Sequence, residues 1–511
     1  ENDDRLNHRE GRVLPGLVSC QSLRPSDRIS SEEAEEMKLT RSFGWSRLEG
    51  HDVDEAFEVL DERYSYSIPG AWFSPAYKRG RWDGKVHLIR RRKGGSLVFP
   101  SGLFSEVKER LLKARFNVEA EDLRPAARPF RSPVQWSGPN LRDYQNEAVR
   151  AAIESEGGII KLPIRAGKTI VASRIMFEMK TRTLFVVPSD LLVRQSAEKF
   201  EACLDGANVV VWDGVNHNEA DVLVVTIQTL NSITGSTGRF DPSLLDPFGV
   251  VFYDETHHLT GVGEAWRKTA IGVPARIKFG LSATVEVSKR KSAKSDKSSI
   301  WLRGICGPKL IDLSMSDLIE RGFLVRPTIR FVRHHAPEVQ AKNWSESLYR
   351  EAIAECKERN DRIVSEAVKF AKLGKRVLID VARVYHAEEL VERLSRELGD
   401  QAVTMLVGRS TKEERQEGIS RFIEGESPVI VGTILGEGVD IPAIDIVINA
   451  EGGKAKVSTV QRLRNLTLRE GKTEAITIEF VDDHNPRFKK WTLERLRIYR
   501  KEPAFRIEVE E

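Results

Sequence analysis

The chain has 511 residues, with 80 Lys and Arg against 76 Asp and Glu, so its formal net charge is only +4. This length exceeds what one hydrophobic core usually supports, and about three domains are expected. The near balance of charge excludes a uniformly basic nucleic-acid-binding protein, so any such surface has to be local. The four cysteines are far apart and form no C-x-x-C pair, which argues against zinc and against a disulfide framework.

Residues 1–36 are polar and aperiodic, and we expect them to be disordered. The first methionine is Met37, directly after a Glu-rich segment. Because glutamate codons are purine-rich, as ribosome-binding sequences are, two interpretations stay open: a natural start at Met37, or an ordinary disordered tail. The chain shows neither a signal-peptide apolar core nor a run of about 18 apolar residues, so we expect a cytoplasmic protein with no membrane partner.

Residues 37–122 predict a small α/β domain. The pattern predicts helices over 52–63 and 103–116, and a hairpin of strands 85–90 and 96–99 around a turn at Gly94 and Gly95. Cations are concentrated in and before this hairpin, and we call them the basic cluster: Lys78, Arg79, Arg81, Lys85, Arg90, Arg91, Arg92 and Lys93.

The basic cluster contains one acid, Asp83, and two interleaved aromatic residues, Tyr77 and Trp82. Cations with aromatics suit a phosphate backbone and stacked bases. The alternative is a solvated hairpin edge that uses Lys and Arg to prevent strand pairing. The run from Arg90 to Lys93 favours nucleic acid, because an edge strand would alternate. Residues 123–140 contain four prolines and no periodicity, so they are interpreted as a linker.

Residues 162–169 have the pattern of a phosphate-binding loop between an apolar strand, 158–161, and an amphipathic helix, 170–177. In such a loop the backbone N–H groups of Ala166 and Gly167 face the phosphates, Lys168 reaches the β and γ oxygens, and the Thr169 hydroxyl holds magnesium. The general pattern has glycine where this chain has Leu162.

Upstream of the loop, residues 141–145 open a helix that contains Arg142 and Gln145. A glutamine amide offers a donor and an acceptor that match the N6/N7 edge of adenine, and an arginine can lie on the face of the base. Only the position of this pair just before the phosphate-binding loop indicates a role in binding the base, since an isolated Gln145 would be an ordinary surface residue.

After the loop, apolar strands alternate with helices, as expected for a parallel sheet. The predicted strands cover 183–187, 209–212, 222–226, 250–253 and 277–281. The fourth ends in Asp254, Glu255 and His257, at the carboxyl edge where α/β proteins bind ligands. Asp254 can hold magnesium through water, and Glu255 can orient or deprotonate an attacking water. Further strands at 376–381, 404–407 and 429–433, with a helix over 386–398, predict a second domain of the same type.

Three motifs in order, Leu-Pro-x-x-x-Gly-Lys-Thr, Asp-Glu-x-His and Ser-Ala-Thr at 282–284, resemble those of the superfamily-2 helicases. Many members carry a second loop glycine where Arg165 stands here. The resemblance implies an ATP-driven motor of two RecA-like domains. It also implies nucleic-acid contacts by residues after two strands and in a later motif: Pro188, Ser189, Thr226, Gln228 and Thr433.

Residues 431–442 match the family motif that couples nucleotide to nucleic acid, with Asp440 near the ribose. The resemblance also implies nucleotide binding by Gly438 and Gln461. The next family motif, Gln-x-x-Gly-Arg-x-x-Arg, is altered from Gln461 onward. Phosphoryl transfer needs a guanidinium from the facing domain on the γ-phosphate. Three residues are candidates, with Arg464 first because it shares a helical face with Gln461, followed by Arg462 and Arg469.

A narrower resemblance lies in the N-terminal domain and the C-terminal stretch 489–505. Phe-Ser-Pro-x-Tyr at 73–77, Trp-Asp-Gly-Lys at 82–85 and Phe-Pro-x-Gly-Leu at 99–103 resemble the UvsW helicases of tailed phages, which remodel branched DNA and R-loops. This resemblance implies DNA, including RNA–DNA hybrids, as the partner of a phage-encoded recombination or repair enzyme.

We therefore expect an α/β protein with two tandem RecA-like parallel-sheet domains, at 141–325 and 326–511, after a nucleic-acid-binding domain at 37–122. It is expected to be a monomeric DNA helicase that uses ATP and magnesium to act on forks, four-way junctions and R-loops. Two alternatives stay open. One is an ATP-gated DNA-binding protein with weak hydrolysis, and the other is the translocating subunit of a restriction system.

Overall fold

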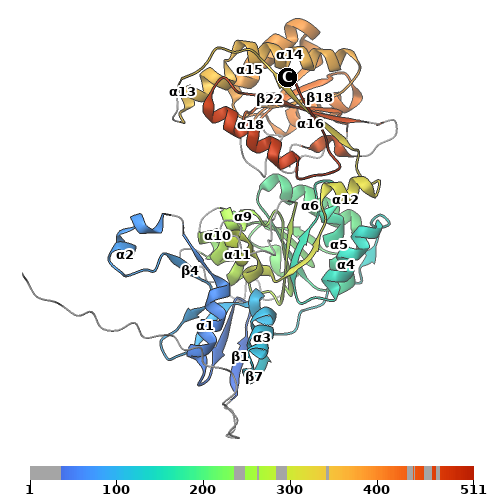
Figure 1. Ribbon diagram of the computed structural model, residues 1–511. Coiled ribbons are helices and arrows are strands. Elements are labelled where there is room, and N and C mark those ends of the chain that lie inside the picture. The colour runs from blue at the N-terminus through green and yellow to red at the C-terminus, as the bar shows by residue number, and fades with distance from the viewer. Residues whose placement is uncertain are drawn as a thin grey trace, which may run out of the picture.

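A computed structural model describes residues 36–68, 70–234, 248–261, 264–283, 296–340, 344–433, 441, 443–453, 463–467, 472 and 474–510. The predicted disorder of residues 1–36 and the altered arginine motif fall largely outside these ranges. Figure 1 shows a small N-terminal domain followed by two larger lobes, each with a central sheet flanked by helices. Within the described ranges, no helix is both long enough and apolar enough to cross a bilayer.

The N-terminal domain is built on a mixed sheet of order β5-β6-β2-β1-β7. Its strands are β1 Met37–Arg41, β2 Trp45–Glu49, β5 Arg90–Arg91, β6 Leu97–Pro100 and β7 Val118–Asp122. Helices α1 Val53–Tyr64 and α3 Phe104–Lys113 confirm the two predicted helices. The predicted hairpin strand at 85–90 is divided, because β4 Lys85–His87 pairs with β3 Ser65–Ser67 and only β5 pairs with β6.

Residues 70–84 leave this sheet, and we call them the arm. The arm contains the 3-10 turn Ala71–Phe73 and the short helix α2 Pro75–Lys78, whose N-terminus is capped by the Ser74 hydroxyl. Figure 1 shows α2 standing away from the sheet of its own domain.

Lobe 1 has a parallel seven-stranded sheet of order β12-β13-β10-β14-β15-β9-β16. Its strands are β9 Gly158–Lys161, β10 Thr183–Val187, β12 Val209–Val211, β13 Val222–Thr226, β14 Val250–Tyr253, β15 Ile277–Ser282 and β16 Lys309–Asp312. Its helices include α4 Asp143–Ile153, α5 Lys168–Met179, α6 Asp190–Cys203, α7 Ile227–Thr234, α9 His258–Gly261, α10 Glu264–Gly272 and α11 Asp296–Cys306. The strands predicted for this lobe are confirmed to within one residue.

Lobe 2 repeats this plan with the parallel order β19-β20-β18-β21-β22-β17-β23. Its strands are β17 Pro327–Arg333, β18 Val377–Asp380, β19 Val403–Leu406, β20 Val429–Gly432, β21 Ile446–Asn449, β22 Ala475–Val481 and β23 Arg506–Val509. Its helices include α13 Glu346–Tyr349, α14 Lys357–Lys372, α15 Val384–Leu398, α16 Lys412–Glu424 and α18 Pro486–Tyr499. The fold class of two tandem RecA-like lobes behind a small α/β domain is confirmed.

The Pro-rich stretch 123–140 is not a free tether. Its strand β8 Gln135–Trp136 pairs with β11 Leu204–Asp205 of lobe 1. The backbone N–H of Arg131 donates to Asp221 Oδ1 at 2.7 Å, and that of Phe130 donates to the Lys180 carbonyl. These contacts bind the predicted linker along lobe 1.

The N-terminal domain also shares a hydrophobic core with lobe 1. One contiguous cluster of buried side chains includes Leu39 and Leu103 on one side and Trp301 and Ile305 of α11 on the other. The Trp301 indole N–H donates to the Tyr66 hydroxyl at 3.1 Å. These contacts join the N-terminal domain to lobe 1 as one packed body.

The two lobes meet along α12 Met315–Glu320 and the chain that follows it. Glu502 of lobe 2 accepts hydrogen bonds from the backbone N–H and the hydroxyl of Ser316, at 3.0 and 2.7 Å. The Val325 N–H donates to the Leu466 carbonyl at 3.0 Å. Residues 463–467, which include Arg464, therefore lie beside the crossover between the lobes.

Candidate nucleotide-binding site

The phosphate-binding loop joins β9 to α5, as the sequence predicts. Gly167 precedes α5 with φ 76°, a left-handed conformation in which L side chains are strained. Arg165 is also left-handed, with φ 67°. Arg165 therefore occupies a backbone conformation that glycine adopts without strain.

The side chain of Lys168, the first residue of α5, points toward the segment that follows β14. Its Nζ lies 3.6 Å from Glu255 Oε1, and both side chains are largely buried. His257 Nδ1 lies 3.2 Å from the other oxygen of Glu255 and 3.4 Å from the Ser282 hydroxyl. Four residues predicted from three separate motifs thus meet at one point.

The sheet order explains this meeting. β14 and β9 both flank β15, so the segments that follow these three parallel strands leave the sheet at one edge. The Thr256 hydroxyl donates to the Leu281 carbonyl at 2.9 Å and ties the Asp-Glu segment to β15. Glu255 itself has φ 44°, so it turns sharply out of the strand direction.

Thr169 and Asp254 are the predicted magnesium ligands. Thr169 is the second residue of α5, and Asp254 directly follows β14, with both side chains half-buried. A hydroxyl and a carboxylate are oxygen ligands of the type that magnesium prefers, and the N-terminus of α5 attracts anions. This donor set fits a magnesium–phosphate group.

Gln145 lies under the loop. Its Nε2 donates to the Ala166 carbonyl at 2.9 Å, and its Oε1 accepts from the Arg142 N–H at 3.0 Å. One donor hydrogen and one acceptor lone pair of this amide remain for a base. The Arg142 guanidinium lies 5.1 Å from the ring centre of Phe323, a residue that no sequence motif indicated because a distant segment brings it there.

The segments expected to contact nucleic acid also come together. Gln228 Nε2 donates to the Pro188 carbonyl at 3.0 Å, which joins the ends of β13 and β10. The Thr226 hydroxyl accepts from the Thr229 N–H at 3.1 Å and fixes the turn into α7. Ser189 precedes α6 as its N-terminal cap residue. These four predicted residues lie at the same sheet edge as the nucleotide site, farther along it.

The structure describes only some residues of the lobe 2 motifs. Thr433 follows β20, and its N–H donates to the Leu406 carbonyl at 3.1 Å. The backbone of Arg464 begins the 3-10 turn Arg464–Leu466 at the lobe junction. The remaining candidates lie outside the described residues: Gly438, Asp440, Gln461, Arg462 and Arg469.

The basic cluster divides into two parts. Arg91 forms ion pairs with Asp54 and Glu58 and lies 4.2 Å from the Phe57 ring centre, while Arg90 lies 5.4 Å from that of Trp45. β5 is an edge strand, so these features favour the solvated-edge alternative for this part. Arg92 and Lys93 lie in the exposed turn that follows.

The arm has the other part of the cluster. Lys78, Arg79 and Arg81 are exposed, and so are three aromatic side chains beside them: Trp72, Phe73 and Tyr77. Trp82 is half-buried, and its indole N–H donates to the Lys85 carbonyl at 2.6 Å. The exposed aromatic residues Trp72 and Phe73 were not recognised as a group from the sequence, because exposure cannot be read from local pattern.

Comparison with known families gives two tandem matches. Residues 138–287 match the model of the type III restriction enzyme res subunit, and residues 359–464 match the helicase conserved C-terminal domain. The chain belongs to the superfamily-2 helicases. The first match spans the nucleotide-binding loop and the Asp-Glu segment, and the second ends at Arg464.

Relatives of this helicase span most of its length. The DNA 3'-5' translocase XPB2 of Sulfurisphaera tokodaii is 28% identical over 82% of this chain and 96% of its own. The ATP-dependent DNA helicase uvsW of Enterobacteria phage T4 is 22% identical over 84% and 88%. Among solved structures, the ATP-dependent type ISP restriction-modification enzyme LlaBIII bound to DNA matches with TM-score 0.53 at 15% identity, covering 73% of this chain and 32% of that one.

Proposed function

We propose that this helicase is an ATP-dependent DNA translocase that remodels branched DNA such as forks, four-way junctions and R-loops. The observation that carries the proposal is the contact of Lys168 with Glu255 at the sheet edge, 3.6 Å apart, with His257 on the other side of the carboxylate. A phosphate-binding lysine and a water-activating carboxylate side by side are what ATP hydrolysis requires.

Each residue has a distinct role in this proposal. The N–H groups at the start of α5 and the Lys168 ammonium bind the phosphates, and Thr169 and Asp254 hold magnesium. When bound, magnesium neutralises charge on the β and γ oxygens. Glu255 orients the attacking water and accepts its proton, while His257 holds the Glu255 carboxylate and links it to Ser282. Gln145 and Arg142 bind the base.

Branched DNA as the substrate is supported by the arm. Its exposed cations suit phosphates, and its exposed rings suit bases that have lost their stacking partner, which occur where strands separate. The relatives named as DNA translocase and DNA helicase support DNA as the nucleic acid. A monomeric motor is the simplest assembly, because both RecA-like lobes belong to one chain.

One observation favours a second candidate, an ATP-gated DNA-binding protein with slow turnover. Arg165 is held in a left-handed conformation that costs about 1 kcal/mol or more for a residue other than glycine. A strained loop residue at this position can tune nucleotide binding separately from hydrolysis.

The decisive experiment measures ATP hydrolysis with and without DNA, and then unwinding of forked, four-way and R-loop substrates. We expect hydrolysis to rise on addition of DNA and branched substrates to be resolved, with a Glu255→Gln variant inactive in both assays. DNA binding that depends on ATP but shows no stimulated turnover would favour the second candidate. Unwinding of blunt duplexes as fast as of junctions would contradict the branched-DNA specificity.

A further inference from the structure

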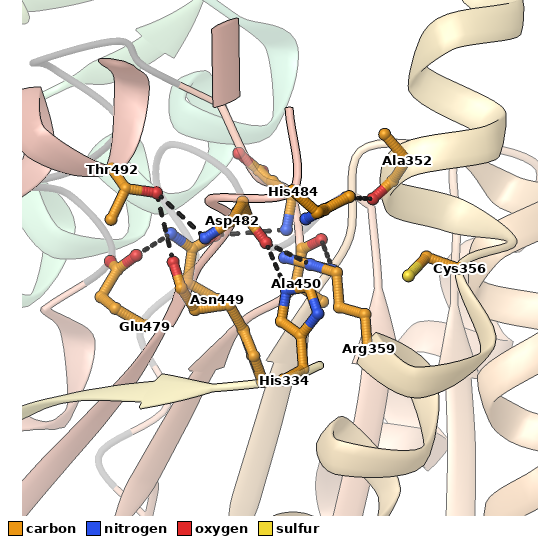
Figure 2. Close-up of polar contacts among 12 residues, drawn as sticks. His334, Ala352, Cys356, Arg359, Asn449, Ala450, Glu479, Asp482, His484 and Thr492 are labelled. Carbon is orange, nitrogen blue, oxygen red and sulfur yellow. Dashed lines mark hydrogen bonds and ion pairs between the residues drawn. The ribbon is translucent and has the colours of Figure 1, made fainter. Parts of the chain in front are cut away.

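Lobe 2 contains a buried ionic network where β21 and β22 end. The Asp482 carboxylate accepts a hydrogen bond from Arg359 Nε at 2.8 Å and lies 3.2 Å from His334 Nε2. Arg359 and Asp482 are fully buried, and Figure 2 shows Arg359 and His334 converging on Asp482. Burial alone would raise the pKa of Asp482, but Arg359, His334 and Arg495 together lower it below its ordinary value.

A second buried pair lies beside the first. Arg495 Nε of α18 donates to Glu479 Oε2 at 2.8 Å, and Asn449 Nδ2 donates to the same oxygen at 2.8 Å. The Tyr499 hydroxyl donates to the other oxygen of Glu479 at 2.7 Å. Arg495 also lies 3.5 Å from Asp482, so the two pairs form one network.

Both guanidinium groups use a further nitrogen to hold the chain that leaves β21. Arg359 Nη1 donates to the Ala450 carbonyl at 2.9 Å, and Arg495 Nη1 donates to the Gly453 carbonyl at 2.8 Å. The Tyr349 hydroxyl donates to the Glu451 carbonyl at 3.1 Å. Side chains from three different helices therefore hold three carbonyls within four residues, and we call residues 449–453 the β21 exit.

Local packing restricts the β21 exit further. Gly452 has φ +65°, and a Cβ there would lie 2.8 Å from Ile353 Cδ1. A side chain would thus be strained by the backbone and would also clash with its neighbour. The path of the chain is fixed by glycine geometry as well as by hydrogen bonds.

The segment that follows the β21 exit in the sequence contains the altered arginine motif, from Gln461 to Arg469. Within it, Asn465 is fully buried, and its Nδ2 donates to the Asp445 and Ile476 carbonyls at 3.0 and 2.8 Å. Buried polar side chains therefore hold the chain on both sides of Arg462, at the β21 exit and at the turn that begins with Arg464.

Stability alone is a weak reason for such a network. Burying two ion pairs costs solvation energy that their attraction barely repays, and apolar residues often serve a core equally well. A guanidinium, however, can bind a carboxylate with one edge and a backbone carbonyl with another, which an apolar side chain cannot do. The arrangement of donors thus points to fixing the position of the chain.

We propose that Arg359 and Arg495 are positioning residues for ATP hydrolysis, because by holding the β21 exit they fix where the chain leaves the lobe 2 sheet before the turn Arg464–Leu466 beside the lobe crossover. The inference rests on the proposed ATP hydrolysis and adds two residues that act on it through the backbone. Neither residue belongs to a helicase motif identified in the sequence.

The test replaces each residue conservatively, as Arg359→Lys and Arg495→Lys. Lysine keeps the charge that faces Asp482 or Glu479 but cannot bind the carboxylate and the carbonyl in the same fork geometry. The matched control is Arg362→Lys on the same helix as Arg359, because Arg362 pairs with Glu366 at 2.8 Å and Glu510 at 2.6 Å, away from the β21 exit.

Three measurements are compared in the full chain with DNA present. We expect faster amide hydrogen exchange in residues 449–453 and 463–467, and a kcat lower by about 100-fold, the size of loss that a displacement near 1 Å can produce. ADP affinity should stay within twofold of the parent, while affinity for ADP with aluminium fluoride, which mimics the transferred phosphoryl group, should fall with kcat. The control should change none of these.

A lower melting temperature with unchanged kcat and unchanged exchange would overturn the proposal and leave a purely structural network. If the lysine variants do not fold, the double variant Glu479→Gln with Arg495→Met removes both charges of one pair while releasing Gly453, and the same outcomes apply to it. A parent without DNA-stimulated hydrolysis would contradict the proposed function. The exchange measurement would still decide whether the two arginines hold the β21 exit.

Discussion

The arm offers the sharpest test of how this helicase grips DNA. Changing Lys78, Arg79 and Arg81 together to Ser removes three exposed cations for which the structure gives no ion pair with a carboxylate. Each phosphate contact on duplex DNA contributes about 0.9 to the slope of log affinity against log salt, so the slope should shrink by about 2.7. A fourfold rise in salt should then weaken the parent about 40 times more than the variant.

The matched control removes three cations from the same domain that already have carboxylate partners: Lys38 with Glu121 at 2.8 Å, Arg47 with Glu49 at 3.3 Å, and Lys113 with Glu109. Its net charge changes by the same amount as that of the arm variant. Affinity for one four-way junction is measured by fluorescence anisotropy from 50 to 200 mM salt, the range over which such contacts dominate. Equal slopes for the arm variant and the control would refute the arm as a DNA grip.

Four further outcomes are expected. Lys168→Ala should abolish hydrolysis and weaken ATP binding, whereas Glu255→Gln should keep binding and stop turnover; parental turnover in the latter would contradict its role. Trp72→Ala should weaken junction binding by about 1–3 kcal/mol at every salt concentration, as loss of a stacked base does. Arg165→Gly should leave the melting temperature nearly unchanged, because relief of strain is offset by backbone entropy. Arg462, Arg464 and Arg469 should each be replaced singly by Ala. One of these three variants should lose about 10³-fold in hydrolysis at unchanged ATP affinity.

The strands of lobe 1 were predictable because parallel strands covered on both faces are nearly continuous apolar runs. β10 and β13 are fully buried along their whole length, and their bounds follow directly from the sequence. β22 escaped prediction because buried Thr477 and Glu479 interrupt its apolar run. β7 escaped because its sequence is largely acidic, and parallel pairing with β1 rather than its own propensity makes it a strand.

The residues of the site likewise divide into those that a local sequence pattern indicates and those that it does not. Lys168, Glu255 and Ser282 were found because each follows an apolar strand within a short motif, and sheet topology then brings them together. Contacts between segments distant in sequence left no such signal. Arg359 reaches Ala450 across 91 positions, and the Pro-rich stretch 123–140 resembles a tether although it pairs with lobe 1. Proline suppresses periodicity without preventing contact, so local pattern alone could not distinguish these cases.

The shared core of the N-terminal domain and lobe 1 restricts how DNA can be moved. Because Leu103 and Ile305 belong to one buried cluster, the N-terminal domain moves with lobe 1, and DNA bound by the arm, as we propose, would move with it. Lobe 2 is also joined to lobe 1 by buried apolar side chains, because one cluster includes Leu281 of lobe 1, Leu318 of α12 and Phe331 of lobe 2. The Ser316–Glu502 and Val325–Leu466 hydrogen bonds lie beside this cluster. Exposing apolar area costs about 25 cal/mol per Å², so any change in the position of lobe 2 is expected to pivot about the α12 cluster rather than to break it. Hydrolysis would therefore reposition lobe 2 by a pivot about α12, while DNA bound by the arm, as we propose, stays with lobe 1.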